Sequence, residues 1–240
     1  MTNSNATNNR APKRNSSPAR IATLIVVVLG AAALGLLGVY TDLLWFGQLG
    51  FGSVFTTQIV AQASVFAAGA IVIALLAWTG FYVAYRTRPI YLKFSDERDP
   101  FAGYRILLDQ LRKVIMVGLP VVLGVLGGVA AASQWKLALT WLNRTYTGQV
   151  DPQFGLDISF YLFDLPFLTA LVGYLSAAVL VAGLVGAVVH MIYGNIRFNG
   201  RDTKVAKAAR IQIAVSVAIY LVLQGACLWL DQYSTMTSSS

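Results

Sequence analysis

Hydrophobic and polar positions alternate along this chain in long blocks. Five apolar runs, at residues 21–40, 59–85, 114–132, 167–193 and 211–230, stand between more polar segments. At a rise of 1.5 Å per residue, about 20 residues cross a hydrocarbon core of about 30 Å. Lipid offers the backbone no hydrogen-bond partner, so each run should be a helix. The pattern predicts an all-α transmembrane bundle of five spans.

The charges support this prediction and give it a direction. The chain has 18 Lys and Arg and 10 Asp and Glu, and none of them lies within the five runs. The segments that precede the first run, join the second to the third and join the fourth to the fifth hold 16 of the 18 basic residues. By the positive-inside rule, these segments are cytoplasmic. We therefore expect a cytoplasmic amino terminus and an extracytoplasmic carboxyl terminus.

Composition excludes an ordinary soluble domain, because 57% of the residues are hydrophobic and 12% are charged. The net charge of +8 is scattered among apolar spans, so we read it as a topology signal and expect no nucleic-acid partner. Residues 1–19 are predicted to be a disordered basic cytoplasmic tail and 20–233 the five-span domain. A cytoplasmic amphipathic helix is expected near 100–113, against anionic lipid, and residues 234–240 form a short polar extracytoplasmic tail.

The two outer loops are rich in aromatic residues. The first includes Trp45 and Phe46 beside several glycines, a pattern typical of an interfacial anchor with a tight turn, or alternatively of a docking surface. The second holds Asp151, Asp157 and Asp164. We expect Asp164 to be the N-cap of the fourth span and Asp157 to cap a short interfacial helix. The aspartate spacing matches no calcium loop, so we predict no metal site.

Small residues mark two of the predicted spans. The third contains Gly124-x-x-x-Gly128, which favours close helix packing, with dimerisation left open. The fourth places Ala178, Ala182 and Gly186 at four-residue intervals, followed by the single histidine, His190. A lone histidine is no proton relay, and we expect it to bond a neighbouring helix or a headgroup.

The fifth span carries a polar stripe on one face of its helix. Its members are Gln212, Ser216, Tyr220 and Gln224. Such a stripe either makes hydrogen bonds to neighbouring helices, with Gln58 and Gln62 as expected partners, or lines a hydrated path.

No nucleotide loop, nucleophile elbow or metal-binding cluster is present in the sequence, so we predict no catalytic residue and no cofactor. The leading hypothesis is a non-enzymatic anchoring or assembly module of a cell-envelope complex. The alternative is a transporter or channel subunit for an envelope solute or lipid. A third is an enzyme acting on lipid through Asp151, Asp157 or His190. Expected partners are the lipid bilayer and other membrane proteins or further copies of the chain.

The loop motifs together resemble the amino-terminal part of uncharacterised protein family 0182, a family of large actinobacterial membrane proteins. The motifs are Trp45-Phe46-x-x-Leu49-Gly50-Phe51, Tyr85-Arg86-Thr87-Arg88-Pro89, Asp151-Pro152-Gln153-Phe154-Gly155-x-Asp157 and Trp229-Leu230-Asp231-x-Tyr233. The resemblance implies a multi-pass plasma-membrane protein whose full-length relatives have about seven spans and a large extracytoplasmic domain. It implies that this chain is an amino-terminal part, as a truncated product or a fragment. It supplies no catalytic residues.

Overall fold

The computed structural model describes residues 18–88, 110–199 and 202–234. They fall into two compact units, residues up to Thr57 and residues from Gln58 onward, and each unit is considered by itself. The predicted tail within 1–17, the predicted amphipathic helix over 100–109 and the end of the chain from 235 lie outside the described residues.

The first unit contains helix α1 (Pro18–Gln48) and the beginning of α2 (Gly52–Arg86). Gly50, with φ of 76°, occupies the left-handed region between them, and the Phe51 N–H donates to the Phe46 carbonyl at 2.9 Å. The rings of Phe46 and Phe55 lie 5.7 Å apart across the turn. This confirms the predicted turn, whereas anchoring or docking by Trp45, whose side chain is exposed, stays a prediction.

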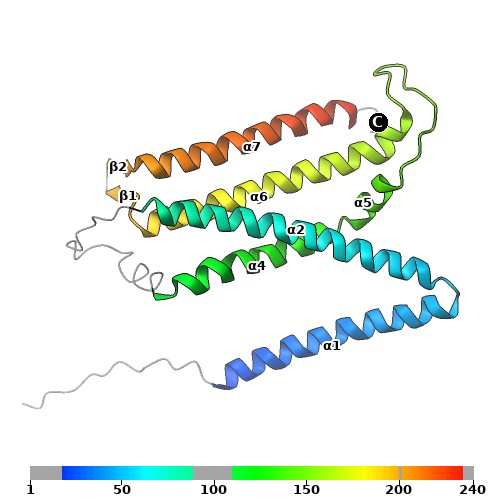
Figure 1. Cartoon of the computed structure of the whole chain (residues 1–240), viewed down its shortest axis with the longest axis horizontal. Coiled ribbons are helices and arrows are strands. Elements are labelled where there is room, and N and C mark those ends of the chain that lie inside the picture. Colours follow the sequence, from blue (N-terminus) through cyan, green and yellow to red (C-terminus); the bar gives the residue numbers. More distant parts are fainter. Residues whose placement is uncertain (1–17, 89–109, 200–201, 235–240) are drawn as a thin grey trace, which may run out of the picture. The chain divides into compact units, whose positions relative to one another are not determined.

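In its described residues, the second unit holds the rest of α2 and four further α-helices, with a π-helical segment and a hairpin. The elements are α4 (Arg112–Ala132), α5 (Trp135–Leu142), η1 (Phe160–Asp164), α6 (Leu165–Ile192), β1 (Ile196–Asn199), β2 (Asp202–Val205) and α7 (Lys207–Ser234). The four long helices lie side by side and alternate in direction (Figure 1). At the end where β1 and β2 lie, called here the hairpin end, α2 and α6 finish and α4 and α7 begin.

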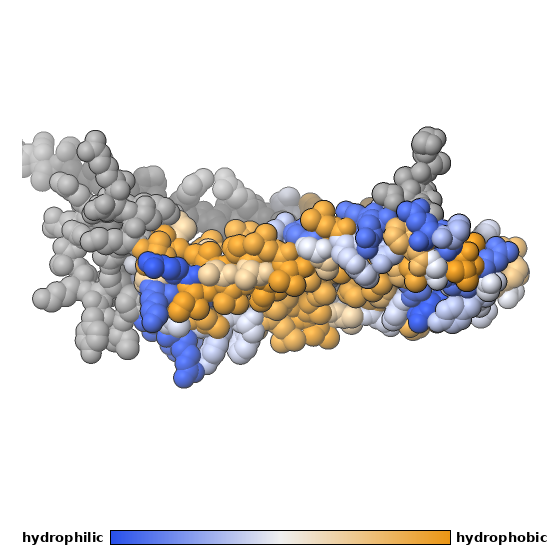
Figure 2. Space-filling view, turned by 90° about the horizontal axis from the view of Figure 1, so that it is seen from above, coloured by the Kyte–Doolittle hydropathy of each residue, from blue (hydrophilic) through white to orange (hydrophobic). Residues whose placement is uncertain are grey.

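Four helices are long and apolar enough to cross a membrane: Gly52–Arg86, Arg112–Ala132, Phe160–Ile192 and Lys207–Ser234. Figure 2 shows hydrophobic residues in the middle of one face, with hydrophilic residues toward both ends. The helical fold and these four predicted runs are therefore confirmed as candidate spans. The run at 21–40 is helical within α1, but five crossings and their direction remain predictions.

The antiparallel hairpin was not predicted. It pairs Ile196 with Val205 and Asn199 with Asp202, so it joins α6 to α7 within the basic segment 194–210. Strands of four residues carry too little apolar alternation to be recognised in a segment dominated by basic residues.

Glycines let the long helices approach closely. A Cβ atom on Gly124 of α4 would lie 2.8 Å from the carbonyl oxygen of Ala70 in α2, and one on Gly128 would lie 2.9 Å from that of Phe66. Between α2 and α6, a Cβ on Gly80 would collide with the carbonyl of Ala182. The predicted close packing is thus confirmed, and it is made within the chain.

Apolar clusters fill both ends of this unit. At the hairpin end, Phe81 and Ala84 of α2 are buried against Val189 and Tyr193 at the end of α6. At the opposite end, called here the loop end, Tyr161 of η1 and Leu165 of α6 are buried with Leu230 of α7. The space between helices is therefore closed at each end by side chains from segments far apart in sequence.

The glycine contacts generate a prediction about stability. Gly124→Ala should lower the free energy of unfolding by about 1–3 kcal/mol, because the added methyl group would press on the α2 backbone. The matched control is Gly118→Ala on the same helix, where a Cβ meets nothing within 4 Å. Unfolding in mixed detergent micelles measures both. Equal losses for the two variants would contradict the proposed role of close approach.

Candidate functional site

The predicted polar residues His190 and Gln212 meet in a hydrogen-bonded network near the hairpin end. The Gln212 Nε2 amide donates to the Gly80 carbonyl at 2.9 Å, which turns the Gln212 oxygen toward His190 Nε2, also at 2.9 Å. Nε2 therefore donates, and Nδ1 accepts from the Asn195 side-chain amide at 2.8 Å. The bonding fits a neutral imidazole and connects α2, α6 and α7.

The end of α6 places Asn195 in this network. Gly194 adopts a φ of 71°, its N–H donates to the Met191 carbonyl, and the Asn195 N–H donates to the His190 carbonyl at 2.9 Å. This is a Schellman motif, in which a left-handed glycine turns the chain back over the last helical turn. The Asn195 side chain is thereby directed at the His190 ring. Sequence analysis missed Asn195, although Gly194 directly after an apolar run was an available signal.

Burial explains why the network is complete. The His190 side chain is fully buried and Asn195 is 3% exposed, and an unpaired amide or imidazole there would cost about 1–3 kcal/mol. Among the residues the structure describes, no buried side-chain nitrogen or oxygen lacks a partner. The prediction that His190 bonds a neighbouring helix is confirmed. The predicted partners Gln58 and Gln62 are wrong for Gln212, which binds His190 and Gly80.

The remaining stripe residues behave differently along α7. Ser216 is half-buried against α6, where a Cβ on Gly183 would lie 3.1 Å from the Ser216 Cβ. Tyr220 and Gln224 are also half-buried, but neither has a hydrogen-bond partner within the described part of the chain. The stripe is therefore satisfied by protein at its Gln212 end, whereas Gln224 offers an amide with no partner there.

At the loop end, Asp157 organises the connection between α5 and η1. Its carboxylate accepts from the Ser159 N–H at 2.7 Å, the Gly148 N–H at 2.9 Å, and the N–H and hydroxyl of Thr147. The Ser159 backbone N–H, aided by the Ser159 hydroxyl and Thr147, holds the pKa of Asp157 well below its ordinary value of 3.8. Asp157 caps a helix, as expected, and that helix continues into the long segment of η1 and α6.

Asp151 closes a neighbouring turn in the same loop. Its carboxylate accepts from the Phe154 N–H at 2.7 Å and from the Tyr161 hydroxyl at 3.2 Å. Its backbone carbonyl accepts from the Gly155 N–H, and Gly155 has a φ of 67°. The turn thus directs Phe154 toward Tyr233 of α7, with the ring centroids 4.9 Å apart.

The expected N-cap role of Asp164 is wrong. Asp164 already has helical backbone angles, because the π-helical segment η1 precedes α6 directly, and its side chain makes no capping bond. Its Oδ1 instead accepts from the Trp141 indole N–H at 2.9 Å and lies 3.6 Å from Nε of Arg144. Asp164 therefore ties α5 to the start of the candidate span Phe160–Ile192.

The structure brings the candidates together in two groups. His190 and Gln212 meet near the hairpin end, and Asp151 and Asp157 lie in one loop at the opposite end. Trp45 and Phe46 belong to the first unit. Within residues 18–88, 110–199 and 202–234, no three His, Cys, Asp or Glu side chains are grouped so that they could hold a metal ion. The arrangement is suited to holding segments together.

The lowered pKa of Asp157 generates a pH prediction. The folded state binds the Asp157 proton less readily than the unfolded chain, so this carboxylate stabilises the fold above about pH 4 and loses that effect as the pH falls. Thermal unfolding between about pH 5 and about pH 2 should show a smaller acid-induced loss in Asp157→Asn. The matched control, Asp231→Asn, removes an exposed carboxylate of α7 with the same change in net charge. An unchanged slope in Asp157→Asn would contradict the assignment.

The hydrogen-bonded network around His190 generates a prediction about stability that compares two glutamines of α7. Gln212→Leu should destabilise the protein by about 1–3 kcal/mol, since it leaves the buried His190 Nε2–H without its acceptor. Gln224→Leu removes the same amide from the same stripe but breaks no described hydrogen bond, so it should cause no such loss. Chemical unfolding in detergent measures both variants. A loss in Gln224→Leu as large as that in Gln212→Leu would refute the distinction.

Comparison with known proteins gives matches over nearly the whole chain. A UPF0182 protein of Clavibacter sepedonicus is 40% identical over 235 residues, covering 98% of this chain and 24% of that relative. UPF0182 proteins of Leifsonia xyli and Thermobifida fusca are 42% and 39% identical, over 96% of this chain and 23% and 22% of their own lengths. The chain thus spans about a quarter of the length of these relatives. No solved structure matches it.

A family model described as "Uncharacterised protein family (UPF0182)" matches residues 19–240, which include both groups of polar residues. This agrees with the resemblance seen in the loop motifs. The chain belongs to the UPF0182 family.

Proposed function

We propose that this region is a non-enzymatic module of the bacterial plasma membrane that anchors or assembles a cell-envelope complex. The four apolar helices support insertion, and the proposal takes the helical run at 21–40 as a fifth span. The described basic side chains Arg86, Arg112 and Lys207 belong to helix ends at the hairpin end. The proposal therefore places the hairpin end in the cytoplasm and the loop end outside.

Gln224 is the observation that carries the assembly role. It lies about 9 Å along α7 from Leu230, well inside the apolar run, at 1.5 Å per residue. An amide moved into hydrocarbon without a hydrogen bond is unfavourable by several kcal/mol. No described residue bonds it, and Leu221 and Leu228, three residues before it and four after it on the same helix face, are exposed. A further membrane helix packed on this face would bury the apolar side chains and supply the missing hydrogen bond.

The bonding of the candidate catalytic groups favours a structural role. Both Asp151 and Asp157 accept several hydrogen bonds from their own loop, and both ring nitrogens of His190 are engaged. A general base needs a lone pair that can reach a substrate proton. These groups use their lone pairs within the protein, on backbone N–H groups, hydroxyls and a side-chain amide, which supports a module that holds segments in place.

Site-specific photo-crosslinking tests the proposal. A photoreactive amino acid is placed at Gln224 in the chromosomal copy of the gene, so that everything normally attached to this region is present. We expect a protein–protein crosslink from position 224, because this face receives another helix. The matched control is Ser216, which already packs on Gly183 of α6 and should crosslink within the region. Crosslinks from position 224 to lipid alone would contradict assembly on this face.

A transport or channel subunit is the second candidate, because the same half-buried Tyr220 and Gln224 side chains suit a hydrated path. Solute flux in proteoliposomes separates the two functions. Transport predicts that Gln224→Leu abolishes flux. Assembly predicts that the variant leaves flux unaffected while it lowers recovery of the crosslinked complex from native membranes.

A further inference from the structure

Three arginines converge on tyrosines at the hairpin end of the second unit. The Arg88 guanidinium carbon lies 4.1 Å from the centroid of the Tyr85 ring and 5.3 Å from that of Tyr193. The Arg112 guanidinium carbon lies 5.8 Å from the same Tyr85 centroid. Two cations are thereby held over one ring, by residues that come from the end of α2 and the beginning of α4.

Hydrogen bonds add a second set of donors to this cluster. Arg112 Nη1 donates to the Tyr85 hydroxyl at 2.9 Å, and Arg86 Nη1 donates to the Tyr82 hydroxyl at 2.8 Å. A phenol oxygen that accepts in this way keeps its own O–H for donation. Guanidinium N–H and phenol O–H groups side by side form a donor set suited to phosphate oxygens, which accept several short hydrogen bonds.

The rings under these cations are held rigidly. Phe81 stacks on Tyr85 with the centroids 6.2 Å apart, and Tyr85 meets Tyr193 edge-to-face at 5.7 Å. Phe81 and Tyr193 are 1% and 3% exposed. Buried aromatic side chains therefore restrict the motion of the Tyr85 ring, which limits the conformational entropy that the cluster loses when it binds a ligand.

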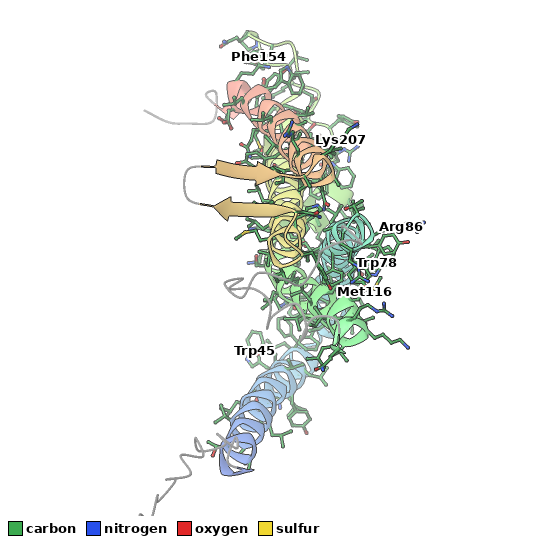
Figure 3. The ribbon with its side chains drawn as sticks, turned by 90° about the vertical axis from the view of Figure 1, so that its left-hand side faces the viewer. Trp45, Trp78, Arg86, Met116, Phe154 and Lys207 are labelled. Carbon is green, nitrogen blue, oxygen red and sulfur yellow. The ribbon has the colours of Figure 1, made fainter. Side chains whose placement is uncertain are left out.

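Hydrocarbon-facing side chains continue directly from the cluster along the same helices. Val83 of α2 and Val114 and Val117 of α4 are exposed, and the latter two lie within the first turns after Arg112. In Figure 3, which faces this end, Arg86 and Trp78 of α2 and Met116 of α4 lie on the side away from the hairpin strands. Cationic donors thus border an exposed apolar surface, an arrangement that matches a phosphate headgroup with its acyl chains.

We propose that Arg88, Arg112 and Tyr85 form a binding site for the phosphate of an anionic phospholipid in the leaflet at the hairpin end. Its acyl chains lie against the exposed valines of α2 and α4. Lys113 and Arg86 add positive charge, which favours an anionic headgroup and disfavours a choline headgroup. The site joins α2 to α4, so a bound lipid stabilises the contact between these two helices.

Lipid-dependent thermal stability of the purified full chain in mild detergent tests the site. Phosphatidylglycerol and phosphatidylcholine with identical acyl chains are titrated separately, and so is inorganic phosphate. We expect phosphatidylglycerol alone to raise the unfolding temperature saturably. The double variant Arg88→Gln/Arg112→Gln should raise the half-saturating phosphatidylglycerol concentration on the order of tenfold or more.

The matched control removes two cations from the opposite end. Lys136 and Arg144 also lie over aromatic rings, at 5.7 Å from Trp135 and 5.1 Å from Trp141, so Lys136→Gln/Arg144→Gln makes the same change in net charge. This control should bind phosphatidylglycerol as the wild type does. An equal effect of phosphatidylcholine or inorganic phosphate, or an equal loss of affinity in the control, would overturn the proposed site.

Tyr85→Phe keeps the proposal testable if the double variant fails to fold. It retains the ring under Arg88 and removes only the hydroxyl. We expect a several-fold loss of phosphatidylglycerol affinity, measured as the lipid-induced rise above the variant's own lipid-free unfolding temperature. Unchanged affinity would overturn the site. Because purified protein is used without any partner, this result is independent of assembly through Gln224.

Discussion

The structure depends on one constraint: a polar group removed from water must find its hydrogen bond within protein. Helices satisfy this for the backbone of each apolar run. The side chains of His190, Gln212 and Asn195 satisfy it together, and the acceptor that completes their network is a backbone carbonyl of α2. The same constraint makes Gln224 informative, because no residue in the described part of the chain bonds its amide.

Close approach of backbones makes such a network possible. Gly186 of α6 leaves room for the Gln212 amide, and a side chain at that position would occupy the space that the amide fills. Gly80 brings α2 against Ala182 and exposes its own carbonyl to α7. Small residues and polar residues therefore act jointly, since the glycines set the helix separation that the hydrogen bonds require.

The sequence predicted the parts of this fold that follow from local physics. Long apolar runs require helices in lipid, so the four candidate spans and their alternation followed from hydropathy and charge. The periodicity of α7 placed Gln212 on an inward face. The identity of its hydrogen-bond partners depended on how α2, α6 and α7 pack together. The sequence pattern of a single helix does not predict that packing. That is why Gln58 and Gln62 were chosen wrongly and Gly80 was not considered.

The outer loop shows the same division between local and long-range information. Asp157 was expected to cap a helix from its place before an aromatic run, and it does. The role given to Asp164 failed because the helix starts earlier than its proline suggests, through a π-helical turn. The pairing of Trp141 with Asp164 joins residues 23 positions apart, and the arginine–tyrosine cluster at the hairpin end likewise joins α2, α4 and the end of α6.

The number of residues in the π-helical segment sets how the preceding loop is rotated relative to α6. In η1 the Leu165 N–H donates to the Phe160 carbonyl five residues back, so the turn holds one residue more than an α-helical turn. Deleting a residue there would restore the α-helical repeat and rotate everything before it by about 100° about the axis of α6. Tyr161 would then turn away from Leu230 of α7, against which it is buried, while Leu165 stayed in place. A change of length in this segment therefore alters the phase between the loop and the bundle, which a change of side chain does not.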